Sequence, residues 1–293
     1  MLIGIVAAAL GALGYGTATV LQARAVAPSD RSVVVRRWLF ASGLVADGTA
    51  WLLSLVAFRF LPLAAAQAVL ASSVAVTAVL AHLIIRTRIA SRTLVAGALF
   101  VVGAAMIASS AAPITRHTLS PQLLILGSAA LMGVSVVAAS AYRRGSATWL
   151  SVVAGVAFAG TAVCGRLLEL PHLTAATILD SGLLLGFSLV GIVAFARALT
   201  LGSEAGVSAV MWMTELILAF VTGAALLGDT VRSGFAAVAI AGAACGVFAC
   251  RMLISDHPHE GRGASQAVAA CGSMPDESGQ PAGSSSVRPA VRA

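Results

Sequence analysis

The stretch "WLFASGLVADGTAWLLSLVAF", residues 38–58, is apolar along almost its whole length and contains one ionisable residue, Asp47, near its midpoint. A transmembrane helix needs about 20 mainly apolar residues to cross a hydrocarbon core about 30 Å thick. The stretch therefore predicts a membrane-spanning helix that carries a carboxyl group close to the middle of the bilayer.

The rest of the chain has the same apolar character. Hydrophobic residues make up 59% and charged residues only 10% of the 293 residues, and the mean hydropathy is +0.98. Soluble domains carry about 25% charged residues, so the surface of this protein cannot be mainly aqueous. The apolar runs are continuous, unlike the alternating segments of about ten residues that form a β-barrel. The predicted class is an all-α polytopic integral membrane protein.

Nine apolar runs are expected to be transmembrane helices. The predicted spans are 2–22, 38–58, 62–85, 93–112, 121–141, 149–169, 176–198, 205–227 and 235–254. They form one transmembrane domain, 1–254, with halves at about 1–141 and 149–254. The remaining segment, 255–293, is rich in Gly, Ser, Pro and Ala and lacks aromatic residues. We expect it to be a disordered tail, because it cannot bury enough apolar surface to offset its ordering entropy.

The arginines predict the orientation of the chain, since all 18 basic residues are Arg. With spans that alternate in direction, eleven arginines fall on one side: Arg24, Arg31, Arg36, Arg37, Arg86, Arg88, Arg92, Arg143, Arg144, Arg197 and Arg251. The other side has four, with the three arginines of the distal tail left out of the count: Arg59, Arg116, Arg166 and Arg232. Basic residues concentrate on the cytoplasmic side. We therefore expect a multi-pass protein of the cell (inner or plasma) membrane with its N-terminus outside and its tail in the cytoplasm.

A weak internal repeat relates two regions about 142 residues apart. Residues 61–100 align with residues 203–242, each as a long span, a short polar turn and a span of small residues. The arginine distribution places the equivalent turns on opposite sides of the membrane, as in the inverted repeats of transporters. The prediction is two weakly related inverted halves.

Both aligned regions resemble the EamA-type halves of the drug/metabolite transporter (DMT) superfamily. Asp229 in "LLGDTVRSG" matches the acidic turn position of that pattern. The chain also resembles the NIPA-like magnesium-transporter branch in its nine-span count and in the segments "LQARAV" (21–26) and "GLVADGTAW" (43–51). Asp47 matches the carboxylate that this branch has in span two. The resemblance covers about residues 1–254 and implies transport of a small molecule or cation.

Two intramembrane carboxyl groups are the leading candidates for a substrate or ion site. A charged side chain at a helix centre costs about 2.5–3.5 kcal/mol on insertion scales. The presence of Asp47, and of Glu215 in the stretch "VMWMTELILAF", therefore needs a structural or functional explanation. Asp47 shares a helix face with Gly43, Ala50 and Ser54, which predicts that it points into the bundle. For both residues, a purely structural hydrogen bond between helices is the alternative.

The other candidates have weaker signals. Gln67 is expected either to line a pathway or to bridge two helices. His82, near the cytoplasmic end of the same span, is a candidate proton relay, with simple solvation as the alternative. Arg166 and Glu169 are one helical turn apart and are expected to form an exposed ion pair.

The predicted function is gradient-driven secondary transport by alternating access, in which the carboxyl groups bind a cation or exchange protons with the substrate. The chain has no HExxH, GxSxG or Walker A motif, so we expect no enzymatic activity and no cofactor. Coupling to protons or to a divalent cation is left open. The expected partners are the lipid bilayer and a small-molecule or ion substrate, with no nucleic acid; a homodimer is left open. The alternative function is a non-transporting scaffold or assembly factor for cell-envelope proteins.

Overall fold

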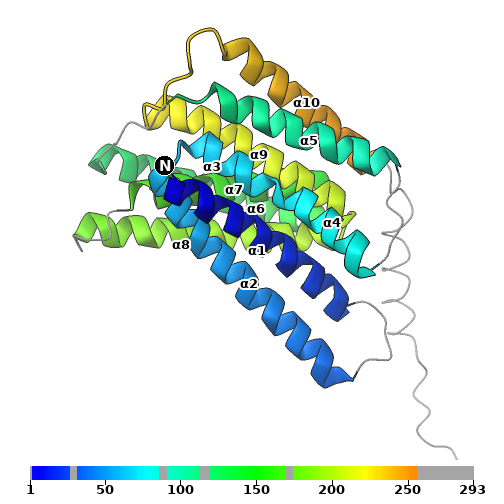
Figure 1. Cartoon of the computed structure of the whole chain (residues 1–293). Helices are drawn as coiled ribbons and strands as arrows, with labels where there is room; N and C mark the ends of the chain where they lie inside the picture. Colours follow the sequence, from blue (N-terminus) through cyan, green and yellow to red (C-terminus); the bar gives the residue numbers. More distant parts are fainter. Residues whose placement is uncertain (1, 27–31, 86–90, 113–118, 169–173, 256–293) are drawn as a thin grey trace, which may run out of the picture. The chain divides into compact units, whose positions relative to one another are not determined.

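The computed structural model describes residues 2–26, 32–85, 91–112, 119–168 and 174–255, and within these ranges it contains ten α-helices and no strand (Figure 1). The helices are α1 Leu2–Val26, α2 Val33–Phe60, α3 Leu63–Ala71, α4 Ser73–Ile85, α5 Ser91–Ser110, α6 Pro121–Arg144, α7 Ala147–Leu167, α8 Ala175–Leu199, α9 Glu204–Leu226 and α10 Ala236–Ser255. Eight of them are long and apolar enough to cross a membrane. The chain is therefore an all-α multi-pass membrane protein, as predicted. The expected tail lies outside the described residues, except for Ser255 at the end of α10.

The span predicted at 62–85 is interrupted at Ser72, and this interruption divides it into α3 and α4. The Ser72 backbone N–H bonds to the carbonyl of Val69, three residues back, at 3.1 Å. The Ser72 hydroxyl also donates to this carbonyl, at 2.6 Å. A serine that bonds back to its own helix competes with the regular hydrogen-bond ladder and bends it. The eight other predicted spans agree with the observed helices to within a few residues.

Hydroxyl side chains mark the starts of five helices. Each of these residues accepts a hydrogen bond from a backbone N–H in the first turn of its helix, which satisfies a donor that has no partner within the helix. They are Ser32, Ser120, Ser146, Thr174 and Ser203. This local chemistry explains why the helices begin at these points of an otherwise uniformly apolar chain.

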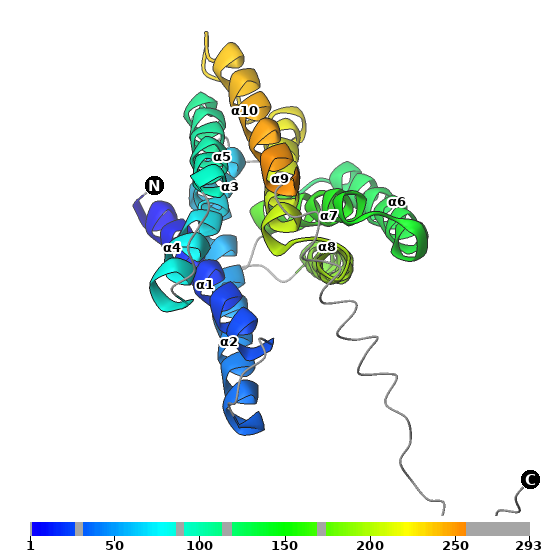
Figure 2. The ribbon, with the colours of Figure 1, turned by 90° about the vertical axis from the view of Figure 1, so that its right-hand side faces the viewer.

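The helices pack in two similar groups. In the first, α1 contacts α2 and both α3 and α4; in the second, α7 contacts α8 and α9. The groups meet where α3 packs on α9 and α5 on α10 (Figures 1 and 2). The core lies mainly along these contacts, in one cluster from α3, α5, α9 and α10 and another that includes α1, α2, α3, α7 and α9.

The α3–α9 and α5–α10 contacts are both antiparallel. The segment that follows α5 bonds to the segment that precedes α10, through Ala112 N–H to Thr230 O and Arg232 N–H to Ser110 O, each at 2.9 Å. The first residue of α3, Leu63, donates its N–H to the carboxyl of Asp229, which follows α9, at 3.4 Å. The start of one helix therefore lies beside the end of its partner in each pair.

The α5–α10 contact depends on the absence of a side chain at Gly103. A Cβ atom at this position would lie 2.6 Å from the carbonyl oxygen of Gly242 and 2.9 Å from the backbone nitrogen of Gly246. Backbone atoms cannot move aside, so Gly103→Val is expected to push the helices apart and to cost about 1–3 kcal/mol of stability. Gly97→Val, on the same helix, is the control, since a Cβ there meets nothing within 4 Å. Thermal unfolding of the purified variants measures the difference, and equal stability of the two would contradict the proposed contact.

Candidate functional site

Gln67 and Glu215, both predicted as site residues, form a hydrogen bond at the contact between α3 and α9. The amide Nε2 of Gln67 donates to Oε1 of Glu215 at 2.7 Å. The side chains are almost fully enclosed, with exposed fractions of 1% for Gln67 and 7% for Glu215. The bond joins residues 148 positions apart in sequence, so two regions that align in the internal repeat meet at this point.

The side-chain carbonyl of Gln67 is not satisfied by this bond. Its Oε1 atom is buried and accepts no hydrogen bond from any residue that the structure describes. A buried acceptor without a donor costs free energy, of the order of 1–3 kcal/mol. The pair therefore leaves one polar atom enclosed between α3 and α9 without a described partner.

Two aromatic residues from different helices pack beside this pair. The rings of Tyr15 on α1 and Trp212 on α9 are in edge-to-face contact, with centroids 5.6 Å apart. Tyr15 lies near Ser54 of α2 and within electrostatic range of both Asp47 and Glu215. The two carboxyl groups predicted from the sequence thus lie in the neighbourhood of one tyrosine, although they belong to different helices and do not contact each other in any described interaction.

Asp47 lies on the side of α2 that faces the bundle. Gly43, Ala50 and Ser54, its predicted neighbours on one helix face, are all buried, and Asp47 itself is half-buried. Leu44 on another face of the helix is 58% exposed, as expected for a side chain in contact with lipid. The sequence prediction of the direction in which Asp47 points agrees with this arrangement.

Arg166 was expected to form an exposed ion pair with Glu169. Its side chain is instead buried: the guanidinium group pairs with the carboxyl group of Asp229 at 3.3 Å, and their side chains are only 7% and 9% exposed. Arg166 also donates to the carbonyls of Phe58 and Leu61, where α2 ends. Glu169 lies outside the described residues, so its pairing with Arg166 stays a prediction. The exposed position expected for Arg166 is wrong, because buried carbonyls and a buried carboxyl group satisfy several of its five guanidinium donors.

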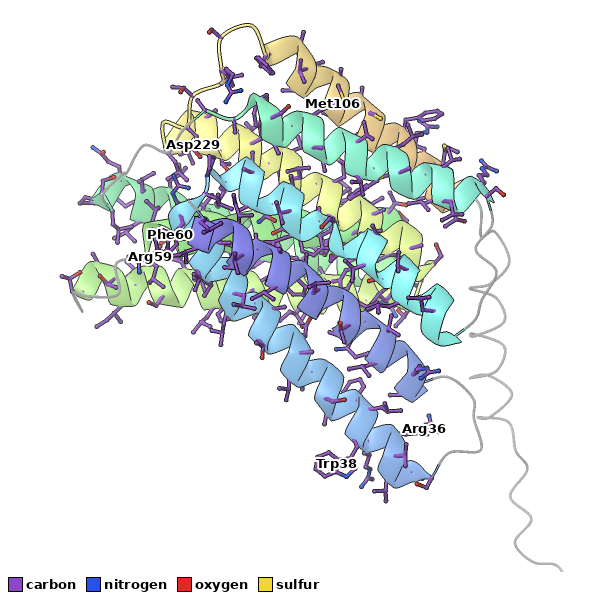
Figure 3. All side chains as sticks on the ribbon, viewed as in Figure 1. Arg36, Trp38, Arg59, Phe60, Met106 and Asp229 are labelled. Atoms are coloured by element: carbon purple, nitrogen blue, oxygen red, sulfur yellow. The ribbon has the colours of Figure 1, made fainter. Side chains whose placement is uncertain are left out.

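Asp229 lies in the turn after α9, but it is not a solvated turn residue, since its side chain is only 9% exposed. Gly228 has φ of 60°, a left-handed conformation that favours glycine at the end of a helix. This turn allows the backbone N–H of Asp229 to reach the carbonyl of Gly223 at 2.9 Å. Its carboxyl group then joins the start of α3 to α7. Figure 3 shows Asp229 at the same end of the helices as Arg59 and Phe60, with Arg36 and Trp38 at the opposite end.

His82 cannot be placed in this site, because its side chain lies outside the described part of the structure, although its backbone belongs to α4. Among the described residues, no three His, Cys, Asp or Glu side chains gather in a way that would hold a metal ion.

Two residues with polar side chains in the core were not predicted as site residues. Tyr15 lies within "GALGYG" (11–16), where small residues surround it and favour close packing of helices. Asp180 is a single carboxyl group in the run "AATILDSGLLLGF" of α8, and only 1% of it is exposed. The signal that identified Asp47, an ionisable residue inside an apolar span, also applies to Asp180, but the predicted loop nearby made it look like a residue at the end of a span.

Comparisons of the chain with protein-family models, with curated proteins and with solved structures find no match.

Proposed function

We propose that this multi-pass membrane protein is a gradient-driven secondary transporter of the drug/metabolite type, which moves a small molecule or cation by alternating access. The observation that carries the proposal is the buried Gln67–Glu215 pair, with its unsatisfied amide carbonyl, at the contact between two similar helix groups. Polar residues inside membrane segments are costly and most often mark substrate or ion pathways.

The packing of the helices supports this proposal. A two-fold axis in the membrane plane makes equivalent helices antiparallel, and transporters with such inverted repeats bind substrate where the repeats meet. In this chain α3 is antiparallel to α9 and α5 to α10, and the aligned regions contain these same helices.

In this proposal the two carboxyl groups have different partners. Glu215 is held by Gln67 and can exchange a proton or a cationic group of the substrate at a position closed to water. Asp47 is half-buried and lies within electrostatic range of the same Tyr15 side chain, so it can receive the proton or cation on its way to or from Glu215. The orientation proposed from the arginines places the start of α1 outside the cell and the end of α10 in the cytoplasm, in the cell membrane.

The test uses the full chain in proteoliposomes that enclose a pH-sensitive dye. A pH gradient is imposed, and a panel of organic amines, neutral metabolites and Mg²⁺ is added in turn. The wild-type protein is expected to move protons or solute in response to at least one compound, whereas empty liposomes do not. Glu215→Gln and Asp47→Asn are each expected to abolish the coupled movement, because an amide cannot exchange a proton at neutral pH.

Thr214→Val is the matched control. This residue is adjacent to Glu215, but its hydroxyl donates to the carbonyl of Val210 in its own helix, at 2.8 Å, and it should therefore retain transport. Full activity in both amide variants would exclude the carboxyl mechanism. A wild-type protein that moves nothing in the panel, yet captures envelope proteins, would favour the scaffold function.

A further inference from the structure

A second buried carboxyl group lies in a cavity that is separate from the Gln67–Glu215 site. The cavity lies among α6, α7, α8 and α9 and has a volume of about 180 Å³. Its described lining is apolar apart from Cys164, Asp180 and Thr222, and it includes neither Gln67, Glu215 nor Asp47. A ligand in this cavity would therefore not use the residues of the proposed transport site.

Asp180 is incompletely satisfied in this cavity. It is 1% exposed, and the thiol of Cys164 lies close to its carboxyl group. Its second oxygen, Oδ2, is buried and accepts no hydrogen bond from the described residues. No arginine or histidine belongs to the described lining, so the cavity wall offers no cation to this oxygen. The combination of a free acceptor, a carboxyl group and an apolar wall defines the ligand that would fit.

A single water molecule does not suit the site well. A buried water needs two to four polar partners. The Thr222 hydroxyl donates to the carbonyl of Leu218, at 2.6 Å, so toward the cavity it can act only as an acceptor, and apart from the Cys164 thiol the remaining walls are hydrocarbon, with side chains such as Leu123, Val156 and Phe187. A molecule with an apolar body and one strong donor makes better use of this space.

We propose that this cavity binds a small hydrophobic amine, whose ammonium group donates to Oδ2 of Asp180 while its apolar part fills the space between α6 and α9. The volume sets the size of the ligand. An apolar cavity of about 150 Å³ holds a benzene molecule, so about 180 Å³ accepts one ring with a short chain. The ammonium is the donor that the carboxyl group selects, because hydrogen bonds between charged partners are about twice as strong as neutral ones.

The test measures binding of 2-phenylethylammonium to the purified full chain by calorimetry, with ethylbenzene as the neutral probe of similar shape. Asp180→Asn is expected to weaken binding of the amine at least about tenfold, the effect of losing one hydrogen bond to a charged group. It should leave binding of ethylbenzene unchanged. Equal affinity of the amine for the wild type and Asp180→Asn would overturn the proposal.

Two further variants locate the amine. Ala159→Leu adds volume at a buried residue of the cavity wall and is expected to weaken binding of both probes; unchanged binding of both would place them elsewhere and contradict the proposal. Glu215→Gln should leave the affinity for the amine unchanged. Loss of amine binding in Glu215→Gln, but not in Asp180→Asn, would assign the amine to the transport site and overturn the proposed second site. Loss of amine binding in Asp180→Asn, but not in Glu215→Gln, would support the second site even if no transport is detected.

Discussion

Replacing Arg166 with methionine is expected to lower the free energy of unfolding by about 3–5 kcal/mol, because Asp229 would stay buried without its cation. The wild-type pair is 3.3 Å apart and less than one tenth exposed on either side. The same change removes the donors to the carbonyls of Phe58 and Leu61. One substitution therefore loosens α7, the α2–α3 junction and the turn after α9 together. Unfolding in mixed detergent–SDS micelles, followed by circular dichroism, measures the loss.

Two controls separate the buried pair from a general effect of losing an arginine. Arg59→Met removes an exposed arginine from the same end of the helices (Figure 3), and it should change stability by no more than about 0.5 kcal/mol. Arg166→Met combined with Asp229→Leu removes both charges and should recover much of the loss, since apolar replacement of a buried pair is often neutral. If Arg166→Met is as stable as the wild type, the pair does not hold these helices together.

Replacing Glu215 with methionine is expected to abolish transport and also to destabilise the protein by about 1–3 kcal/mol, because both polar atoms of Gln67 would then be buried without a described partner. The double variant Gln67→Met/Glu215→Met should regain the lost stability, since it removes both polar groups and keeps their volume. Transport should remain at the level of empty liposomes. Unfolding and proteoliposome assays on the same preparations measure the stability and the transport activity of each variant.

Comparing Glu215→Met with the double variant distinguishes a functional role of the Gln67–Glu215 bond from a purely structural one. A bond that only joins α3 to α9 would be dispensable once the double variant is stable, and transport would return with stability. A stable but inactive double variant would mean that the polar groups act on a substrate or proton. The conservative variant Glu215→Asp is the additional check, because it keeps the carboxyl group and should retain part of the activity.

Much of the fold follows from local sequence. Long apolar runs identified eight helices directly, and residues such as Ser146 and Ser203 fix where helices begin by capping them. The helical period was enough to show which face of α2 carries Asp47 inwards. The interruption at Ser72 was not predicted, because a serine inside an apolar span is compatible with a regular helix and bends it only when its hydroxyl bonds back to the helix.

The partners of the polar residues could not be predicted in the same way. Sequence spacing identifies the neighbours of Arg166 within one helix, but Asp229 lies 63 positions away and reaches it only after α9 packs on α3 and α7. The bond between Gln67 and Glu215 has the same origin. Such contacts depend on which helix faces meet, and small residues on many faces permit several arrangements with similar local energies.

The position of α6 in the chain has a consequence for the way in which the protein is inserted. Only one residue of this helix, Ala141, is buried, so α6 adds little to the core, and it contacts only α7 and α8. Four predicted spans precede it, with α3 and α4 counted as one, and four follow it. In the proposed topology an even number of crossings returns the chain to its starting side, so the single crossing of α6 would make α7 begin opposite to α1. By parity alone, α6 would then allow two similar groups, made in one polypeptide, to face in opposite directions.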